Sequence, residues 1–571
     1  MKHKDWLIAP PAPHEYLDAF PDLPRLVAQA LYNRGYTDPP TARAFLDGGA
    51  TDTNPFAMRG MQDAVRRLRE AIRRGEPIAV YGDYDVDGVT ATALLVHTLH
   101  VLGAEVRPYI PDRFEEGYGV NQAALEKLAR EGFKVVVTVD CGIRSHTEVI
   151  HGRRLGLDII ITDHHEPAEP LPTAATAIIC PRQPRCTYPT KNLAGVGLAY
   201  KLAQALFMVD EGTPLGRRRG ELTSDDLLDL VALGTVADMA PLTEENRLLV
   251  RRGLPVINQT RRAGLRALFR AARLEPGHIG VDALSYTISP RLNAAGRLEH
   301  AMTSYHLLMT PRPDRAEALA AKLEEQNRQR QALTEKTLSI AQPLALLQLQ
   351  DSRLIFVASS DYPSGVVGLV ANRLMEEFYR PAVVLELSEE TSRGSMRSIP
   401  QVNAVATLDE CRDLFVRYGG HKAAAGFTIR SEHLAELETR LRALVDTALD
   451  SPPVPTLTID AVVPLADIQT GVLPALDRLA PFGQHNGPPI AASLNLAVRE
   501  ARIVGGNHLK LTLSDAQGDT REAIAFRQAE RLGDLPPIVD IAYQVEANRW
   551  NGSTHLQLNV RDVRPGQAMP H

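Results

Sequence analysis

The sequence has few cysteines, no long apolar run and no excess of positive charge. Four cysteines in 571 residues cannot form a disulfide framework, and no further Cys or His pair completes a zinc site beside Cys180 and Cys186. No apolar run reaches the roughly 18 residues that a membrane span needs. We therefore expect reduced thiols, a cytoplasmic location and no membrane partner.

The charge balance excludes one class of nucleic-acid binder and leaves another open. The chain carries 63 Lys and Arg against 69 Asp and Glu, a formal net charge of −6. A protein that coats duplex nucleic acid is usually basic, whereas a local basic groove is compatible with this balance. The composition is 44% apolar and 23% charged, which is typical of globular proteins, and the length predicts about four domains.

Residues 60–265 alternate short apolar runs with helical patterns. The runs at 77–81, 134–139 and 157–162 are apolar on both faces, as are strands of a parallel sheet that is covered by helices on both sides. Helical patterns over 90–102, 122–130 and 146–154 separate these runs. The alternation predicts βαβ units and an open α/β sheet.

Helical and strand patterns divide the remaining chain into further domains. Residues 1–50 are expected to form an N-terminal extension, 51–265 the first α/β domain, and 266–350 an intermediate segment with a long helix. That helix is predicted to begin with a capping box at Asp314 and to stop at Pro343. Residues 351–450 predict a second, smaller α/β domain, and the many short strands of 451–571 predict a β-barrel of the OB-fold type.

The clearest local signal is the acidic run Gly82-Asp83-Tyr84-Asp85-Val86-Asp87-Gly88. An EF-hand loop would need Glu at position twelve, but this position is Leu94, and a strand rather than a helix precedes the run. An Asp-rich surface turn is the simpler alternative. Carboxylates this close repel each other unless a cation or a hydrogen-bond network compensates them.

The other strands favour the cation. The second strand ends at Asp140, the third ends at Asp163-His164-His165, and a helix ends at Asp238. Ligand sites of open α/β sheets lie at the carboxyl ends of the strands. Asp and His ligands without thiolates favour Mn²⁺ or Mg²⁺, and several carboxylates can hold two such ions for phosphoryl transfer.

These motifs, taken in order, resemble the DHH phosphoesterase superfamily, and within it the branch of single-stranded-DNA exonucleases. The match runs from about residue 50 to the C-terminus. The segments that carry it are 82–88, 116–119, 138–142, 163–165, 194–197, 232–238, 289–298, 365–368, 419–421 and 424–427.

The resemblance implies roles for the acidic cluster. Two Mn²⁺ or Mg²⁺ ions would be held by six ligands, among which Asp140 bridges the ions: Asp83, Asp85, Asp87, Asp140, His164 and Asp238. His165 would lie beside the scissile phosphate, and Asp163 would orient its neighbours. Water activated by the metal would attack phosphorus in line and release 5′-mononucleotides from a 5′ end.

The resemblance also implies a path for single-stranded DNA. In the smaller α/β domain, phosphate would be gripped by Arg397, Ser398, Gly419, Gly420 and His421. Arg291, Asn293 and Arg297 would contact the nucleic-acid backbone. The β-barrel would bind the strand, with Trp550 and Phe526 as candidates for base stacking. A monomer serving DNA repair and recombination is implied, with a single-strand-binding protein and a helicase as partners.

Two alternatives remain, the second from another functional class. One is a phosphodiesterase of the same superfamily acting on oligoribonucleotides, cyclic dinucleotides or pyrophosphate, although such relatives are generally shorter and lack the barrel. The other is a non-catalytic DNA-replication scaffold, against which the complete set of acidic and histidine positions argues. The chain departs from the family pattern at Tyr362-Pro363 and at Gln484-His485, both outside the acidic cluster.

Overall fold

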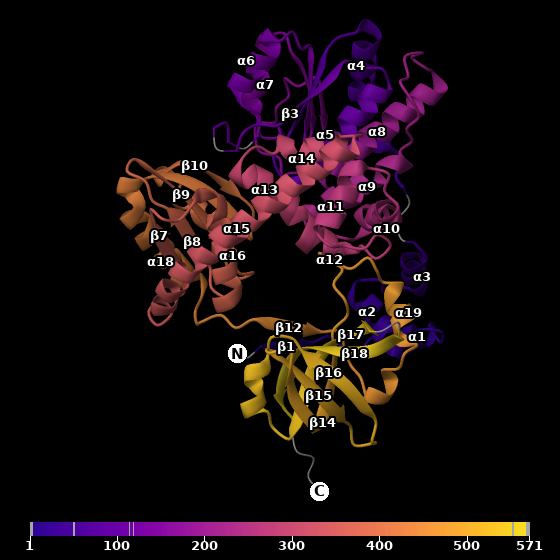
Figure 1. Ribbon diagram of the computed structural model, residues 1–571, viewed down its shortest axis with the longest axis vertical. Coiled ribbons are helices and arrows are strands. Elements are labelled where there is room, and N and C mark those ends of the chain that lie inside the picture. The colour runs from indigo at the N-terminus through magenta and orange to yellow at the C-terminus, as the bar shows by residue number, and fades with distance from the viewer. Residues whose placement is uncertain (1–3, 49–51, 114, 118, 551–552, 567–571) are drawn as a thin grey trace.

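The computed structural model describes residues 4–48, 52–113, 115–117, 119–550 and 553–566. In Figure 1 the first α/β domain and its helical continuation lie at the top, the smaller α/β domain lies at the left, and the β-barrel lies at the bottom. No helix in the described residues is long and apolar enough to cross a membrane.

The first sheet is parallel throughout, as the apolar runs predict. Its strands lie in the order β3 (Val106–Tyr109), β2 (Ile78–Gly82), β4 (Val135–Val139), β5 (Asp158–Thr162) and β6 (Ala177–Ile179). Both faces are covered: Val80 and Val137 enter one hydrophobic core, while Tyr81 and Val136 enter the other. The helices of this domain are α4 (Met61–Arg74), α5 (Val86–Val101), α6 (Gln122–Arg130), α7 (His146–Arg154), α8 (Gly195–Gly212), α9 (Leu228–Ala237) and α10 (Glu244–Asn258).

The helical continuation ends in one long helix. It comprises α11 (Ala263–Ala271), α12 (Val281–Ala283), α13 (Ser289–Leu298), α14 (Met302–Met309) and α15 (Pro313–Gln348). Two predictions about α15 are wrong: Arg312 rather than Asp314 is the N-cap, and the helix continues past Pro343. The continuation is stabilised by packing, because Ala341 and Ala345 on either side of the proline are buried against the smaller domain.

The smaller α/β domain contains a mixed sheet in the order β10-β11-β9-β8-β7. Only β7 and β8 are parallel, and they flank helix α16, as the sequence predicts. The elements are β7 (Ile355–Ser359), α16 (Ser364–Phe378), β8 (Ala382–Glu386), β9 (Thr391–Arg397), α17 (Ala404–Asp409), β10 (Phe415–Gly420), β11 (Ala424–Arg430) and α18 (Leu434–Ala448).

The C-terminal domain is a closed barrel, as predicted. Strands β14 and β17 pair with each other in addition to the ladder β13-β14-β15-β16-β18-β17, and this pairing closes the sheet. The elements are β12 (Thr456–Ile459), β13 (Ala461–Val462), α19 (Val472–Asp477), β14 (Ala491–Val504), β15 (His508–Ser514), β16 (Thr520–Ala525), β17 (Ile538–Trp550) and β18 (Ser553–Pro565).

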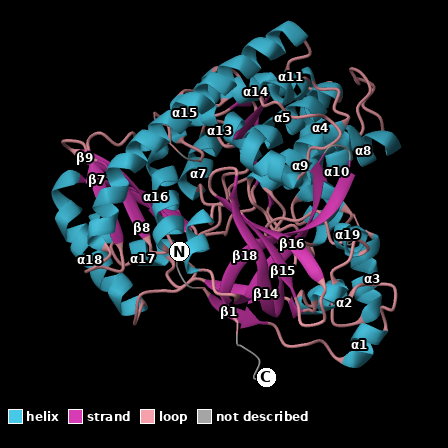
Figure 2. Ribbon diagram, turned by 60° about the horizontal axis from the view of Figure 1, so that its bottom comes forward, coloured by secondary structure: helices cyan, strands magenta, loops and turns pink. Residues whose placement is uncertain are grey.

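The N-terminal segment, from β1 to α3, packs against the C-terminal barrel domain. Strand β1 (Asp5–Ile8) pairs in parallel with β12. Apolar side chains of α1 (His14–Asp18), α2 (Arg25–Asn33) and α3 (Pro39–Asp47), such as Val27 and Leu31, share one hydrophobic core with barrel residues such as Leu476. Figure 2 shows these helices beside the barrel strands. The two ends of the chain therefore fold together.

Candidate metal and nucleic-acid site

The acidic run leaves β2 and immediately begins α5. Asp85 is the N-cap, and its carboxylate accepts a hydrogen bond from the Gly88 N–H at 3.1 Å. A Cβ on Gly88 would lie 2.6 Å from the backbone nitrogen of Asp83, so only glycine lets the loop close this tightly. Asp83 and Asp87, on either side of Asp85 in this turn, are 4% and 1% exposed.

Asp140 follows β4 in a strained backbone conformation. Its φ of 62° lies in the left-handed region, which residues other than glycine seldom adopt. Its N–H donates to the Thr162 carbonyl at 3.0 Å, which keeps it against the neighbouring strand β5. Strain of this kind persists where the surrounding structure enforces it, typically at functional sites.

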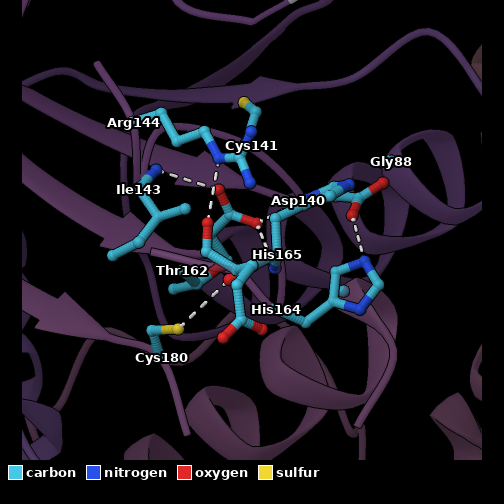
Figure 3. Close-up of polar contacts among 12 residues, drawn as sticks. Gly88, Asp140, Cys141, Ile143, Arg144, Thr162, His164, His165 and Cys180 are labelled. Carbon is cyan, nitrogen blue, oxygen red and sulfur yellow. Dashed lines mark hydrogen bonds and ion pairs between the residues drawn. The ribbon is translucent and has the colours of Figure 1, made fainter. Parts of the chain in front are cut away.

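The two histidines after β5 have different partners. The His165 ring Nδ1 lies 2.7 Å from an Asp163 oxygen, whose partner oxygen accepts the Ile143 N–H at 2.9 Å. The His164 Nε2 lies 3.0 Å from an Asp140 oxygen and its Nδ1 lies 3.9 Å from an Asp238 oxygen. Figure 3 shows Asp140, His164 and His165 converging on one region.

Helix ends hold the remaining carboxylates. Asp87 accepts the N–H groups of Gly195 at 2.7 Å and Val196 at 2.8 Å, which are the first residues of α8. The helix N-terminus favours this negative charge. Asp238 is the C-cap of α9, where the sequence predicts it.

The donor atoms form three overlapping groups, each within 4.8 Å, of the kind that can hold a metal ion. Asp140 and His164 each belong to two of these groups. Within the described residues, Asp83 Oδ1 is buried without a hydrogen bond, and the buried Asp140 Oδ1 and His164 Nε2 lie 3.0 Å apart without forming one. Because such atoms are costly unless compensated, this donor set fits hard divalent cations such as Mn²⁺ or Mg²⁺. The groups are Asp140-His164-His165, Asp87-His164-Asp238 and Asp83-Asp85-Asp140.

The electrostatics of the cluster suit a bound cation. Burial, and then repulsion by Asp238, raises the pKa of Asp87 to about 7. Burial, and then Asp85, raises the pKa of Asp238 to about 8. The pKa of Asp140 is also raised well above its ordinary value by burial and by its acidic neighbours. Carboxylates that resist ionisation in this way are stabilised by a bound cation.

His165 behaves in the opposite way. Burial opposes its charge, but the hydrogen bond and charge of Asp163 outweigh burial and raise the pKa of His165 to about 9. The same pair lowers the pKa of Asp163 to about 2, although burial opposes its ionisation. At neutral pH His165 is therefore a cation held by an ionised carboxylate, whereas burial lowers the pKa of His164 and keeps its imidazole neutral.

Of the predicted residues in the smaller domain, His421 reaches this cluster and Arg397 lies near arginines of the rest of the chain. The His421 ring stacks on His165 with centroids 5.5 Å apart and planes 16° apart. Arg397 is held by a bond from its guanidinium to the Ser395 hydroxyl at 2.6 Å. The Arg297 guanidinium lies 3.5 Å from the Gly365 carbonyl, which comes from the smaller domain. Burial, and then Arg113, lowers the pKa of Arg297 to about 9 and that of Arg397 to about 10, so these cations are crowded together.

The other residues predicted to bind substrate have no described hydrogen bond or ring contact with the histidines or arginines named above. Arg291 is engaged inside the protein, 2.6 Å from Glu324, and the Asn293 side chain accepts the Val86 N–H at 3.2 Å and so supports the acidic turn. The Ser398 hydroxyl is buried without a described partner, and Gly419 and Gly420 end β10 beside His421. Phe526 is 44% exposed on the barrel, and the Trp550 side chain lies outside the described residues.

Arg113 was not among the residues predicted from the sequence. It lies in the loop after β3, with its guanidinium 5.0 Å from the centre of the Tyr84 ring, and it faces Arg297 and Arg397. The available signal was its position just before the motif Glu116-Gly117-Tyr118-Gly119. A basic residue beside a motif is weak evidence alone, since only folding brings it to the site.

Family models match most of the chain in three segments. Residues 77–235 match the DHH family N-terminal domain, 351–448 the DHHA1 domain, and 459–562 the RecJ OB domain. The segments agree with the two α/β domains and the barrel described above.

Proteins that match this chain over most of its length point to the same family. The single-stranded-DNA-specific exonuclease RecJ of Bacillus subtilis is 40% identical over 94% of this chain and 68% of its own length. The protein of the same name from Salmonella typhimurium is 33% identical over 95% of this chain and 96% of its own length.

Solved structures agree as well. RecJ from Thermus thermophilus in complex with Mn²⁺ has a TM-score of 0.84 and 30% identity over 99% of this chain and 80% of that chain. The Mg²⁺ complex of the same protein has a TM-score of 0.78 and 29% identity over 99% of this chain and 79% of that chain. The fold and the superfamily resemblance predicted from sequence are thus confirmed, and the chain belongs to the RecJ family of single-stranded-DNA-specific exonucleases.

Proposed function

We propose that this chain is a metal-dependent exonuclease that hydrolyses single-stranded DNA from the 5′ end and releases 5′-mononucleotides. The observation that carries the proposal is the buried cluster of overlapping ligand groups, which faces a crowded set of arginines across the domain boundary. Relatives with this domain set are named as single-stranded-DNA-specific exonucleases.

The acidic cluster would hold the cations through Asp83, Asp85, Asp87, Asp140, His164 and Asp238. Bound Mn²⁺ or Mg²⁺ supplies activation of water and neutralises charge that develops on the phosphate. His165, kept protonated by Asp163, can donate a hydrogen bond to a phosphate oxygen. His421 stacks against it and limits how the His165 ring can turn.

The arginines would account for the proposed 5′ polarity. Arg113, Arg297 and Arg397 are poorly compensated cations beside the cluster, and such a set attracts a dianionic terminal phosphate. Guanidinium forks bind phosphate oxygens in pairs. A strand with its 5′-phosphate in this set would present its first phosphodiester bond to the cluster, and one nucleotide would then be released per cycle.

The barrel would guide the rest of the strand. Phe526 is an exposed aromatic ring of the kind on which bases stack. Trp550 stays a candidate for the same role. A single-strand-binding protein, a helicase, a monomeric state and a cytoplasmic location stay predictions that rest on the family resemblance.

The decisive experiment compares substrates under one set of conditions. Single-stranded DNA, duplex DNA, RNA and cyclic dinucleotides, each carrying a labelled phosphate, are incubated with the protein in Mn²⁺ or in EDTA. Release of labelled 5′-mononucleotide from single-stranded DNA, lost in EDTA and in Asp140→Ala, supports the proposal. Cleavage of cyclic dinucleotides or RNA alone would instead favour the other superfamily activities.

A further inference from the structure

Consecutive polar side chains are buried at the start of α10. Glu245, Asn246 and Arg247 are 0%, 1% and 1% exposed. Glu245 lies 2.5 Å from the buried ammonium of Lys201, and the Asn246 amide donates to the Asn192 carbonyl at 2.6 Å. These two contacts tie the turn to the first α/β domain.

Arg247 differs, because its donors leave that domain. One terminal nitrogen donates to the Phe45 carbonyl at 3.0 Å, and the other donates to the carbonyls of Arg478 and Ala480, each at 2.9 Å. The guanidinium carbon also lies 3.8 Å from the centre of the Phe45 ring. One side chain thus joins the first domain, the N-terminal helices and the C-terminal domain.

The acceptors explain why a buried cation is tolerated here. Phe45 lies in the last turn of α3, and Arg478 is the C-cap of α19. The last carbonyls of a helix have no intrahelical donor and carry partial negative charge. Arg247 therefore supplies both missing donors and a compensating charge to two helix ends at once, although burial lowers its pKa to about 10.

A second contact lies close by on the same segment. The Leu242 N–H donates to the Gln484 carbonyl at 2.8 Å, and a Cβ on Gly483 would lie 2.6 Å from the Leu242 side chain. Asn486 holds this loop in shape by donating to the Leu479 and Pro481 carbonyls at 3.0 and 2.9 Å. The loop includes the Gln484-His485 departure from the family pattern.

We infer that Arg247 is a positioning residue that locks the barrel and the N-terminal helices onto the catalytic domain. The inference rests on the proposed exonuclease function. When Arg247 makes its contacts with Phe45, Arg478 and Ala480, the distance between the barrel and the acidic cluster is constant. A strand bound on the barrel then always reaches the cluster in the same way. Without these Arg247 contacts, the barrel stays attached through the Leu242 contact and through the chain before β12, and it moves more freely relative to the cluster. Long strands that span both domains then bind less productively, while short ones are unaffected.

The test compares Arg247→Met with Arg252→Met. Arg252 lies on the same helix but pairs with Asp52 and Asp225, away from the barrel. We expect Arg247→Met to raise KM for a long single strand about tenfold, the effect of roughly 1.4 kcal/mol, with kcat and the hydrolysis of a very short oligonucleotide unchanged. Arg252→Met should leave all of these values near wild type. Parallel loss on long and short substrates would overturn the inference.

A second variant, Gly483→Ala, disturbs the contact between Gly483 and Leu242 without removing a charge. Gly483→Ala presses on Leu242 from the barrel side, and we expect a smaller rise in KM for the long strand only. Hydrogen exchange should show faster exchange at residues 478–484 in both variants and unchanged protection of the first parallel sheet. Loosened exchange with unaltered KM for long strands would disprove the lock. A wild-type protein that does not degrade single-stranded DNA would overturn the proposed function instead.

Discussion

The imidazole rings of His165 and His421 lie almost parallel, 5.5 Å apart at their centroids, although they belong to different domains. His165 follows β5 of the first sheet, and His421 follows β10 of the smaller domain. Since burial and then the charge of His165 lower the pKa of His421, the stacked pair holds one cation beside one neutral ring. The stack is where the two domains jointly define the site.

The stack can be tested through His421. In His421→Ala the His165 ring gains freedom to rotate away from the phosphate, and we expect kcat to fall about tenfold or more. In His421→Phe the flat surface remains, so kcat should recover in part. Steady-state rates on single-stranded DNA at saturating Mn²⁺ measure both. Equal loss in the two variants would mean that His421 acts through its nitrogen atoms rather than by stacking.

We expect the Asp140 carboxyl to lower the stability of the metal-free protein and to be required for Mn²⁺ binding. Asp140→Asn removes a buried carboxyl whose ionisation is opposed by burial and by its acidic neighbours, so the metal-free protein should gain roughly 1 kcal/mol in free energy of unfolding. The same variant should lose the rise in Tm on addition of Mn²⁺, along with nuclease activity. Thermal unfolding with EDTA and with Mn²⁺ checks both. Destabilisation in EDTA would show that the carboxylate is needed structurally. Arg252→Met serves as a control that should respond to Mn²⁺ like the wild type.

Metal binding should depend on pH with a defined sign. The pKa values of Asp87 and Asp238 are raised to about 7 and about 8 in the metal-free protein, so both carboxyls hold protons below these values. Cations compete with those protons, and Mn²⁺ affinity should increase as pH rises from 6 to 9, roughly the range around these pKa values. Calorimetry in buffers with different ionisation enthalpies would show proton release. Affinity that does not vary with pH would contradict this assignment.

The same shifts predict an opposite trend for stability without metal. A carboxyl whose pKa is higher in the folded than in the unfolded state stabilises the fold at low pH and loses that contribution as pH rises through the folded value. In EDTA, stability should therefore fall as pH rises through about 7 and 8. In Asp238→Asn this slope should become shallower. Denaturant unfolding at a series of pH values gives the comparison.

The arginine set should control recognition of the strand end. Arg297→Lys and Arg397→Lys keep a charge but lose the fork of donors, so each should raise KM for 5′-phosphorylated DNA by about tenfold. KM for the same DNA with a 5′-hydroxyl should change little. Arg291→Lys is a matched control, because Arg291 is paired with Glu324 inside the protein. An equal rise in KM for both substrates would show that these arginines contact the DNA backbone in general rather than the 5′-phosphate.

Much of the site was predictable because its signals are local. The strand runs, the tight Asp83–Asp87 turn and the residues after β4 and β5 follow from apolar periodicity and from the rule that parallel strands end at one edge. Asp83, Asp140 and His164 therefore meet wherever those strands pair. The long helix was predicted less well at its ends, since burial of Ala341 and Ala345 carries it through Pro343.

The sequence by itself determined the order of the domains, the parallel sheet and the residues that can bind metal, because period, turn chemistry and strand ends act over a few residues. Only the tertiary structure decided that His421 reaches His165, that Arg113 joins Arg297, and that Arg247 fastens the N-terminal helices and the barrel to the first domain. These contacts join segments far apart in the chain. They depend on how whole surfaces pack and on where helix ends lack donors, which no local pattern specifies.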